Sequence, residues 1–440
     1  MSENLRVAVI GGGTGGLCLA HGLAAAGVEV AVYERSRART ERLQGYRLHI
    51  NPHGSAALHE CLPAPEWERF LATRGKGTGD FAFVTEQLRE LAVIDEETGA
   101  DPAAAHHSVS RISLHQVLSA GLDGILWYDK EFVRYETGPK GVTCFFADGT
   151  TAEADLVVGA DGANSRVRAQ LLPHAGRVDT GITAVVGKYP LTAETRGLVP
   201  ARLTAGPNFV LPPRGRAMFT APHEFAGAEV NDETATIDPV LFDNTGSYVT
   251  WAYGASARRL PDGLSELDGA GLRAVVLDQI RGWHPGLSRL VELSPEGTVS
   301  RLPIKTSVPV GPWETGPVTL LGDAVHSMTP FRGIGANTAL RDAQLLCRNL
   351  IGPNLIGPNL IGPDLIGPDL IGSGDVRAAV AHYEHRMREY GFQAVRASAR
   401  SAEDFVTENR FARAMSRSMF AVVGSVPALK RRMFAEHGES

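Results

Sequence analysis

The stretch from Val7 to Arg35, VAVIGGGTGGLCLAHGLAAAGVEVAVYER, decides the fold. It predicts a buried strand, a glycine-rich turn, a helix and a second strand that ends in Glu34. Gly11, Gly13 and Gly16 are spaced as in G-x-G-x-x-G, where they permit a tight turn, close approach of the backbone to a pyrophosphate, and close packing of helix on strand. Glu34 follows Gly16 by 18 residues, near the roughly 20 expected of an acid that binds a ribose hydroxyl. The stretch predicts a dinucleotide site and leaves NAD and FAD both open.

Composition excludes several classes of protein. The 440 residues are 43% hydrophobic and 21% charged, which is typical of a globular protein with roughly two to three domains. A net charge of -6 argues against nucleic acid or an anionic membrane as a partner. Four cysteines without a CxxC pair argue against a metal cluster or a disulfide framework. With no room for a signal peptide before the strand at Leu5 and no long apolar run, we expect a cytoplasmic protein.

Two later stretches have the same layout of buried strand, turn and helix. Residues 154–168, ADLVVGADGANSRVR, place Asp161 and a glycine in the turn. Residues 316–350, GPVTLLGDAVHSMTPFRGIGANTALRDAQLLCRNL, place Asp323 at the end of the strand and start a helix near Gly335. Each of these junctions alone is common in proteins.

Together, the three stretches make the chain resemble the FAD-dependent aromatic hydroxylases, the class A flavoprotein monooxygenases of the p-hydroxybenzoate hydroxylase type. The G-x-G-x-x-G, DG ("GADGANSRVR") and GD ("GDAVHSMTPFRGIGAN") motifs match in order and spacing, and the resemblance extends from Leu5 to about Arg400. It implies that the dinucleotide is FAD. The chain departs from the family at Ile334, where a glutamine is usual; this swap removes a side-chain amide and keeps the backbone donor.

The resemblance also implies an activity. NAD(P)H reduces FAD, O2 adds at flavin C4a, and the resulting hydroperoxide hydroxylates or epoxidises an electron-rich substrate. The expected substrates are aromatic or polycyclic natural products of secondary metabolism. Two alternatives stay open: an FAD-dependent reductase or dehydrogenase of the same fold without oxygen transfer, and a non-catalytic flavin-binding protein. The partners expected are the small substrate and O2, with no nucleic acid and no membrane, and a monomer or homodimer.

Residues in and beside the three motifs are the expected cofactor contacts. Asp323 is a fixed acceptor for the ribityl hydroxyls, Pro330 stiffens the loop beside the flavin, and the helix from Gly335 directs backbone N–H groups at the flavin ring. Arg111 opens a helix, where a cation favours an anionic partner. Arg47 is assigned to the flavin or to the active site. The full set is Gly11, Gly13, Thr14, Gly15, Gly16, Glu34, Arg35, Arg47, Arg111, Asp161, Asp323, Pro330, Gly333, Gly335, Ala336 and Asn337.

We predict no metal site and assign no protein residue as the reactive group, because the cofactor carries the chemistry in this family. His326, within the GD motif, is interpreted as a packed or hydrogen-bonded residue. His106 and His107 are adjacent, so on a strand they face opposite ways and do not hold one metal together.

The predicted fold class is α/β: a discontinuous, GR2-like Rossmann-type FAD-binding domain, an inserted and mostly antiparallel substrate-binding sheet, and a helical C-terminus. The FAD-binding domain is expected to comprise residues 1–76, 103–178 and 301–374. The substrate-binding sheet is expected to comprise residues 77–102 and 179–300, and the C-terminal helices residues 375–440. One helix is predicted over 269–287. Phe209, Phe219, Trp251 and Tyr253 are the candidates for the substrate pocket, each equally compatible with the core because a strand has two faces.

Five pentads of the type NLIGP fill residues 349–373. Proline at every fifth position forbids a continuous helix, and five pentads are too few for a stacked solenoid. We interpret them as an expansion in a surface loop, which chains tolerate well. Deletion of two pentads is expected to leave FAD content, measured by absorbance, and activity unchanged; a loss of folding would contradict this.

Overall fold

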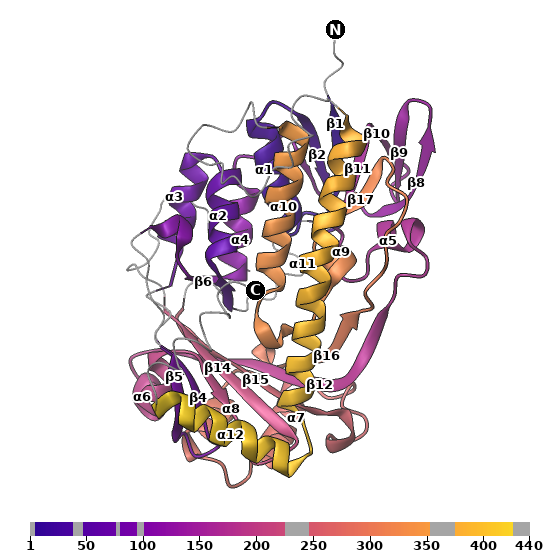
Figure 1. The fold of residues 1–440 in the computed structure, drawn as a ribbon. Coiled ribbons are helices and arrows are strands. Elements are labelled where there is room, and N and C mark those ends of the chain that lie inside the picture. The colour runs from indigo at the N-terminus through magenta and orange to yellow at the C-terminus, as the bar shows by residue number, and fades with distance from the viewer. Residues whose placement is uncertain are drawn as a thin grey trace.

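The computed structural model describes residues 5–37, 47–75, 80–94, 101–224, 246–352 and 375–425. One part of it is built on a five-stranded parallel sheet in the order β17-β11-β1-β2-β7 (Figure 1). These strands are β1 (Arg6–Ile10), β2 (Glu29–Tyr33), β7 (Leu126–Trp127), β11 (Leu156–Gly159) and β17 (Val318–Leu320). β1, β11 and β17 are almost wholly buried, as their continuous apolar sequences predict for a covered parallel sheet.

Helices and two small sheets surround this parallel sheet. The helices are α1 (Thr14–Ala25), α2 (Pro52–Cys61), α3 (Ala64–Ala72), α4 (Arg111–Ser119), α5 (Arg166–Leu171), α9 (Asp323–His326) and α10 (Gly335–Ile351), with η1 (Pro102–Ala104) and η6 (Pro330–Arg332). The small sheets are β3 (Arg47–Ile50) with β6 (His107–Ser110), and β8 (Phe132–Gly138), β9 (Gly141–Phe146) and β10 (Thr151–Ala154). Strand, glycine turn and helix follow one another at Gly11 as the sequence predicts, whereas α9 and η6 lie between β17 and α10.

A seven-stranded sheet, in the order β16-β12-β15-β14-β13-β4-β5, forms the other part. All neighbours are antiparallel except β13 and β4. Its strands are β4 (Phe81–Val84), β5 (Glu90–Ile94), β12 (Arg177–Pro190), β13 (Asn208–Val210), β14 (Arg216–His223), β15 (Tyr248–Ser256) and β16 (Ser300–Ser307). α6 (Ala201–Ala205), η2 (Arg196–Leu198), η4 (Ala257–Arg259) and η5 (Glu296–Thr298) connect them.

Two helices join the parts at the C-terminal end. α11 (Val376–Phe405) runs along both parts, and α12 (Arg410–Ser425) lies across the seven-stranded sheet near β4 and β5 (Figure 1). Glycine lets these helices approach closely: a Cβ added at Gly391 of α11 would lie 2.7 Å from Cδ2 of His326, and one at Gly424 would lie 2.5 Å from the carbonyl oxygen of Leu91.

The predicted fold class is confirmed, and two details are corrected. β16 pairs with β12, so residues 301–307 lie in the seven-stranded sheet, whereas the prediction grouped them with the parallel sheet. The single helix predicted over 269–287 is two helices, α7 (Gly269–Gln279) and α8 (Pro285–Glu292). Gly282 has φ +81° and Pro285 begins α8, so a left-handed residue and a proline end one helix and start the next. The pentads from residue 353 onward lie outside the described residues.

The described helices include none that is both long and apolar enough to cross a membrane.

Candidate cofactor and active site

The first glycine turn is tight on one side and open on the other. Gly11 has φ +111°, and a Cβ there would lie 2.4 Å from the carbonyl oxygen of Ala160; a Cβ at Gly16 would lie 2.3 Å from the carbonyl oxygen of Gly11. At Gly13, the N-cap of α1, a Cβ would meet nothing within 4 Å, and no side chain caps the helix. Its first N–H groups therefore face open space, the arrangement that binds a phosphate.

The acid at the end of β2 is held in place. Oε2 of Glu34 accepts a hydrogen bond from the N–H of Gly12 at 2.8 Å, and Oε1 accepts from the N–H and the hydroxyl of Ser36, each at 2.8 Å. Arg35 beside it is exposed. Gly15 has a packing role, because a Cβ there would lie 2.4 Å from Cδ2 of Leu321.

Asp161, in the DG motif, fixes the start of α5. Its Oδ2 accepts from the N–H groups of Arg166 at 2.7 Å and Val167 at 3.3 Å. Its Oδ1 is buried and has no hydrogen-bond partner among the described residues. A buried acceptor without a hydrogen bond costs free energy, so a hydrogen-bond donor from a bound ligand would fit this position.

The GD motif forms an open surface beside the start of α10. Asp323, Pro330 and Gly333 are all exposed, and Gly322, with φ +65°, turns the chain from β17 into α9. A Cβ at Gly333 would meet nothing within 4 Å, and one at Gly335 would meet only Cγ of Met328, at 3.8 Å. No side chain caps α10. Room for a flat ring therefore lies next to free helix N–H groups.

Asn337 differs from the other residues predicted to contact the cofactor. Its Oδ1 accepts from the N–H of Asn51 at 2.9 Å, and its Nδ2 donates to the carbonyl oxygen of His49 at 2.8 Å. The buried side chain therefore ties α10 to the β3–α2 junction. Thr14 and Ala336 are partly exposed in the first turns of α1 and α10.

The two predicted arginines lie in different settings. Arg111 begins α4 and is exposed. Nε of Arg47 donates to Oγ of Ser108 at 2.8 Å, and Ser108 contacts Nδ1 of His223 at 3.2 Å. Burial, aided by Arg47 and Lys188, lowers the pKa of His223 to about 3. The Arg47 side chain thus lies between β6 and the end of β14, with a neutral histidine next to it.

A buried polar network that the sequence reasoning missed supports the GD motif. Asp342, fully buried on α10, accepts from the N–H of Gly322 at 2.8 Å, from Nε2 of His326 at 2.6 Å and from the hydroxyl of Tyr390 at 2.5 Å. His326 is therefore a hydrogen-bonded interior residue, as interpreted. The available signal was an acid among mostly apolar positions on the buried face of a helix, which requires buried partners.

Arg168 connects the DG and GD motifs. Its Nη1 donates to the carbonyl oxygens of Ala163 at 3.1 Å and Ala324 at 2.8 Å. The turns that carry Asp161 and Asp323 are therefore fixed relative to each other.

The four pocket candidates separate onto two faces of the seven-stranded sheet. Phe219 is paired with Ala252 and Phe209, and these share one face with Phe331 and Phe405. The adjacent residues Trp251 and Tyr253 lie on the opposite face, fully buried in the core against α7 and α8. There Trp251 donates to Oγ of Ser294 at 2.8 Å. Of the two roles left open for Trp251 and Tyr253, the core role is therefore the one that fits their packing.

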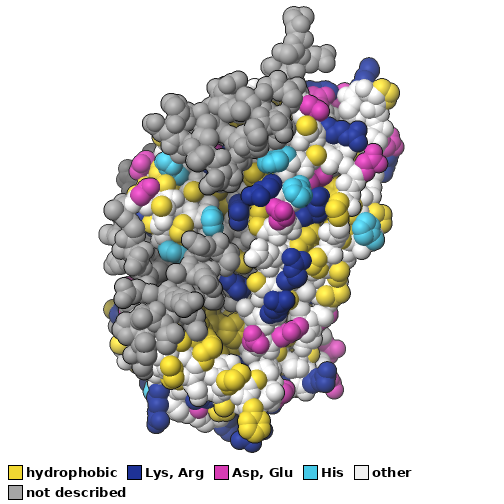
Figure 2. All heavy atoms as spheres, viewed as in Figure 1, with side chains coloured by type: hydrophobic (Ala, Val, Ile, Leu, Met, Phe, Trp, Pro, Cys, Tyr) yellow, Lys and Arg dark blue, Asp and Glu magenta, His cyan; other side chains and the backbone are white. Residues whose placement is uncertain are grey.

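The two faces of the seven-stranded sheet also differ in the hollows beside them. A cavity of about 500 Å³ beside η4 and α7 is lined by Arg259, Val275 and Gln279 among others. It lies on the α7 side of the sheet, so it is not next to the glycine motifs. On the other side, Figure 2 shows hydrophobic side chains at the base of a recess between the two parts of the molecule.

The residues present fit FAD. The open N-termini of α1 and α10 offer hydrogen-bond donors to the phosphates and the flavin ring. The acceptors for the ribose and the ribityl chain are the acid at the end of β2, the exposed acid after β17 and the unpaired Oδ1 of Asp161. Among the described residues, no cluster of histidine, cysteine and acidic side chains suited to a metal ion is found.

Known proteins are similar to the chain in the same regions. Residues 294–353 match the family model of an FAD binding domain, and residues 9–73 that of an NAD(P)-binding Rossmann-like domain. The 3-amino-4-hydroxybenzoate 2-monooxygenase of Streptomyces platensis is 30% identical over 360 residues, 79% of each chain. A crystal structure of an FAD-containing monooxygenase from Photorhabdus luminescens superposes with a TM-score of 0.76 at 35% identity, covering 92% of this chain and 99% of that one. The chain belongs to the FAD-dependent monooxygenase family.

Some relatives are much longer. The dual O-methyltransferase/FAD-dependent monooxygenase elcB of Phaeosphaeria nodorum is 31% identical over 368 residues, which are 77% of this chain and 39% of elcB. The chain thus spans about two fifths of the length of that relative.

Proposed function

We propose that the chain is an FAD-dependent monooxygenase that uses NAD(P)H and O2 to hydroxylate or epoxidise an electron-rich, aromatic or polycyclic small molecule. One oxygen atom enters the substrate, the other leaves as water, and NAD(P)H supplies two electrons. Bound FAD supplies the redox chemistry that passes these electrons to oxygen. The observation that carries the proposal is the open surface where exposed Asp323, Pro330 and Gly333 adjoin the uncapped start of α10.

The chain's own residues would hold the cofactor and shape its surroundings. The α1 N-terminus would bind the pyrophosphate, Glu34 a ribose hydroxyl, and Asp323 the ribityl hydroxyls. N–H groups at the start of α10 would stabilise negative charge on the pyrimidine edge of the flavin ring. Phe209 and Phe219, on the sheet face that meets Phe331, would exclude water from the reacting centre.

The test is oxygen incorporation. Aromatic compounds are screened for those that stimulate NAD(P)H oxidation, and the products formed under 18O2 are analysed by mass spectrometry. Incorporation of one labelled oxygen supports the monooxygenase. NAD(P)H oxidation without incorporation would favour a reductase or dehydrogenase, and retained FAD without any NAD(P)H oxidation would favour a flavin-binding protein.

Glu34→Ala is expected to weaken FAD binding roughly 10-fold, because one charge-assisted hydrogen bond to the ribose is lost. The dissociation constant is measured by quenching of FAD fluorescence on titration with apoprotein. Glu29→Ala is the control, because Glu29 is an exposed acid at the other end of β2. Equal affinities of the Glu34 variant and the parent protein would remove the ribose contact from the proposal.

A further inference from the structure

Seven of the 16 phenylalanines in the chain form one continuous array: Phe81, Phe83, Phe209, Phe219, Phe331, Phe405 and Phe420. Phe209 and Phe405 stack with ring centroids 3.7 Å apart, Phe83 and Phe420 with centroids 4.0 Å apart, and Phe331 and Phe405 with centroids 5.4 Å apart. Phe209 is buried, and the other six keep part of their surface accessible. A contiguous set of aromatic rings that stay partly accessible is suited to bind an apolar ligand.

The array begins at the proposed flavin site. Phe331 directly follows Pro330 in η6, and its Cζ would lie 3.6 Å from a Cβ added at Gly254 of β15. From there the rings continue over β13 and β4 to α12. A substrate at the flavin would therefore meet Phe331 first, and only a longer ring system would reach the rings beyond it.

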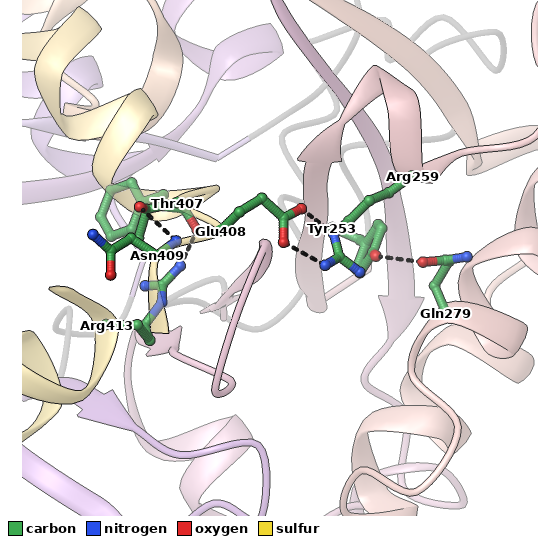
Figure 3. Close-up of polar contacts among 8 residues, drawn as sticks. Tyr253, Arg259, Gln279, Thr407, Glu408, Asn409 and Arg413 are labelled. Carbon is green, nitrogen blue, oxygen red and sulfur yellow. Dashed lines mark hydrogen bonds and ion pairs between the residues drawn. The ribbon is translucent and has the colours of Figure 1, made fainter. Parts of the chain in front are cut away.

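Phe405 and Phe420 come from the C-terminal helices, and the turn between these helices is fixed to the sheet. Arg259 of η4 forms a double ion pair with Glu408, as Figure 3 shows, and the N–H of Gly215 donates to the carbonyl oxygen of Thr407 at 2.9 Å. The buried Arg413 of α12 donates to the carbonyl oxygen of Phe405. These contacts hold the backbone of Phe405 in one place, which is the pre-organisation a specific pocket needs.

We propose that Phe405 and Phe420 are specificity-determining residues that select a substrate of at least two fused aromatic rings. This rests on the proposed function and assigns the outer wall of its pocket to α11 and α12. Phe405 stacks on Phe209 and Phe331, and Phe420 stacks on Phe83, so we expect a substrate ring to meet their hydrogen-bearing edges. Because these edges carry the positive end of the ring quadrupole, they attract the negative face of an electron-rich substrate ring.

The experiment uses the 440-residue, FAD-loaded protein and three probes: phenol, 2-naphthol and 2-hydroxyanthracene. Dissociation constants are measured from the perturbation of the flavin absorbance spectrum. We expect tighter binding as rings are added, and a loss of roughly 3- to 10-fold for the two larger probes in Phe405→Leu and Phe420→Leu, with phenol within about twofold. Leucine keeps the sites apolar, and thermal melts check folding. Phe411→Ala is the matched control, because this α12 phenylalanine is 89% exposed.

The outcomes separate this inference from the proposed function. Three results would overturn the specificity role of Phe405 and Phe420: equal losses of affinity for phenol and 2-naphthol, no loss of affinity at all, or no binding of any fused-ring probe to the parent protein. If the loss of affinity grows with the number of rings but no probe stimulates NAD(P)H oxidation, the specificity role of Phe405 and Phe420 is supported and the monooxygenase activity is not. If oxidation is stimulated and oxygen is incorporated equally in the parent and both variants, the monooxygenase activity is supported and the specificity role is not.

Discussion

Asp342→Ala is expected to lower the free energy of unfolding by about 3–5 kcal/mol, because removal of one member of a buried ion pair leaves the other without compensation. Asp342 accepts from Gly322, His326 and Tyr390, all within 2.8 Å, so three donors lose their acceptor together. Unfolding in urea, followed by circular dichroism, measures the change. Asp278→Ala is the matched control: it removes a helical acid that is paired with Arg281 at the surface, where a loss below about 1 kcal/mol is expected.

The same network predicts a pH dependence of stability. Burial opposes protonation of His326, but the charge of Asp342 and its hydrogen bond outweigh burial and raise the pKa of His326 above 6.5. A raised pKa in the folded state means that the stabilisation is fully present below pH 6.5 and is lost as the pH rises through the folded value. In the Asp342→Ala variant, the free energy of unfolding should therefore decrease less steeply as the pH rises. Parallel stability curves of the parent and the variant above pH 6.5 would contradict a protonated His326.

This network matters because it joins elements that carry the proposed flavin site. Gly322 precedes Asp323, Asp342 lies on α10, and Tyr390 lies on α11. A Cβ at Gly391 would lie 2.7 Å from the ring of His326, so a glycine is required where α11 crosses the GD motif. The position of Asp323 therefore depends on a helix that begins more than 50 residues later in the chain.

The sequence was sufficient for features that lie within short stretches. Gly11, Gly16 and Glu34 belong to one strand–turn–helix–strand unit, and Asp323 and the start of α10 lie close together in the sequence. Strand, turn and helix signals are local there, and a fixed spacing reports their geometry directly. The fold class followed because the motifs order the parallel strands.

Features that depend on distant pairing were not predictable. Alternation shows that Trp251 and Phe219 lie on strands with two faces, but it does not say which face meets α7 and which meets η6. β16 carries no local sign of its partner β12, so the sequence did not show that it lies in the seven-stranded sheet. Phe405 lies almost 200 residues from Phe209, its stacking partner, so no local sequence pattern relates the two rings.

Asp323→Ala is expected to yield largely colourless protein, with FAD affinity reduced about 100-fold or more. Two hydrogen bonds to an ionised acceptor, each contributing about 1.5–3 kcal/mol, would be lost. Asp323 is exposed at the first position of α9, so alanine there leaves no buried partner unpaired, and a loss of FAD is not explained by unfolding. The ratio of flavin absorbance to protein absorbance after gel filtration, together with titration of apoprotein with FAD, measures the effect. Asp262→Ala is the control, because Asp262 is an exposed acid in the loop before α7. Full retention of FAD by the Asp323 variant, with an unchanged melting temperature, would contradict its proposed contact with the ribityl chain and would leave the backbone at the start of α10 as the principal anchor of the flavin.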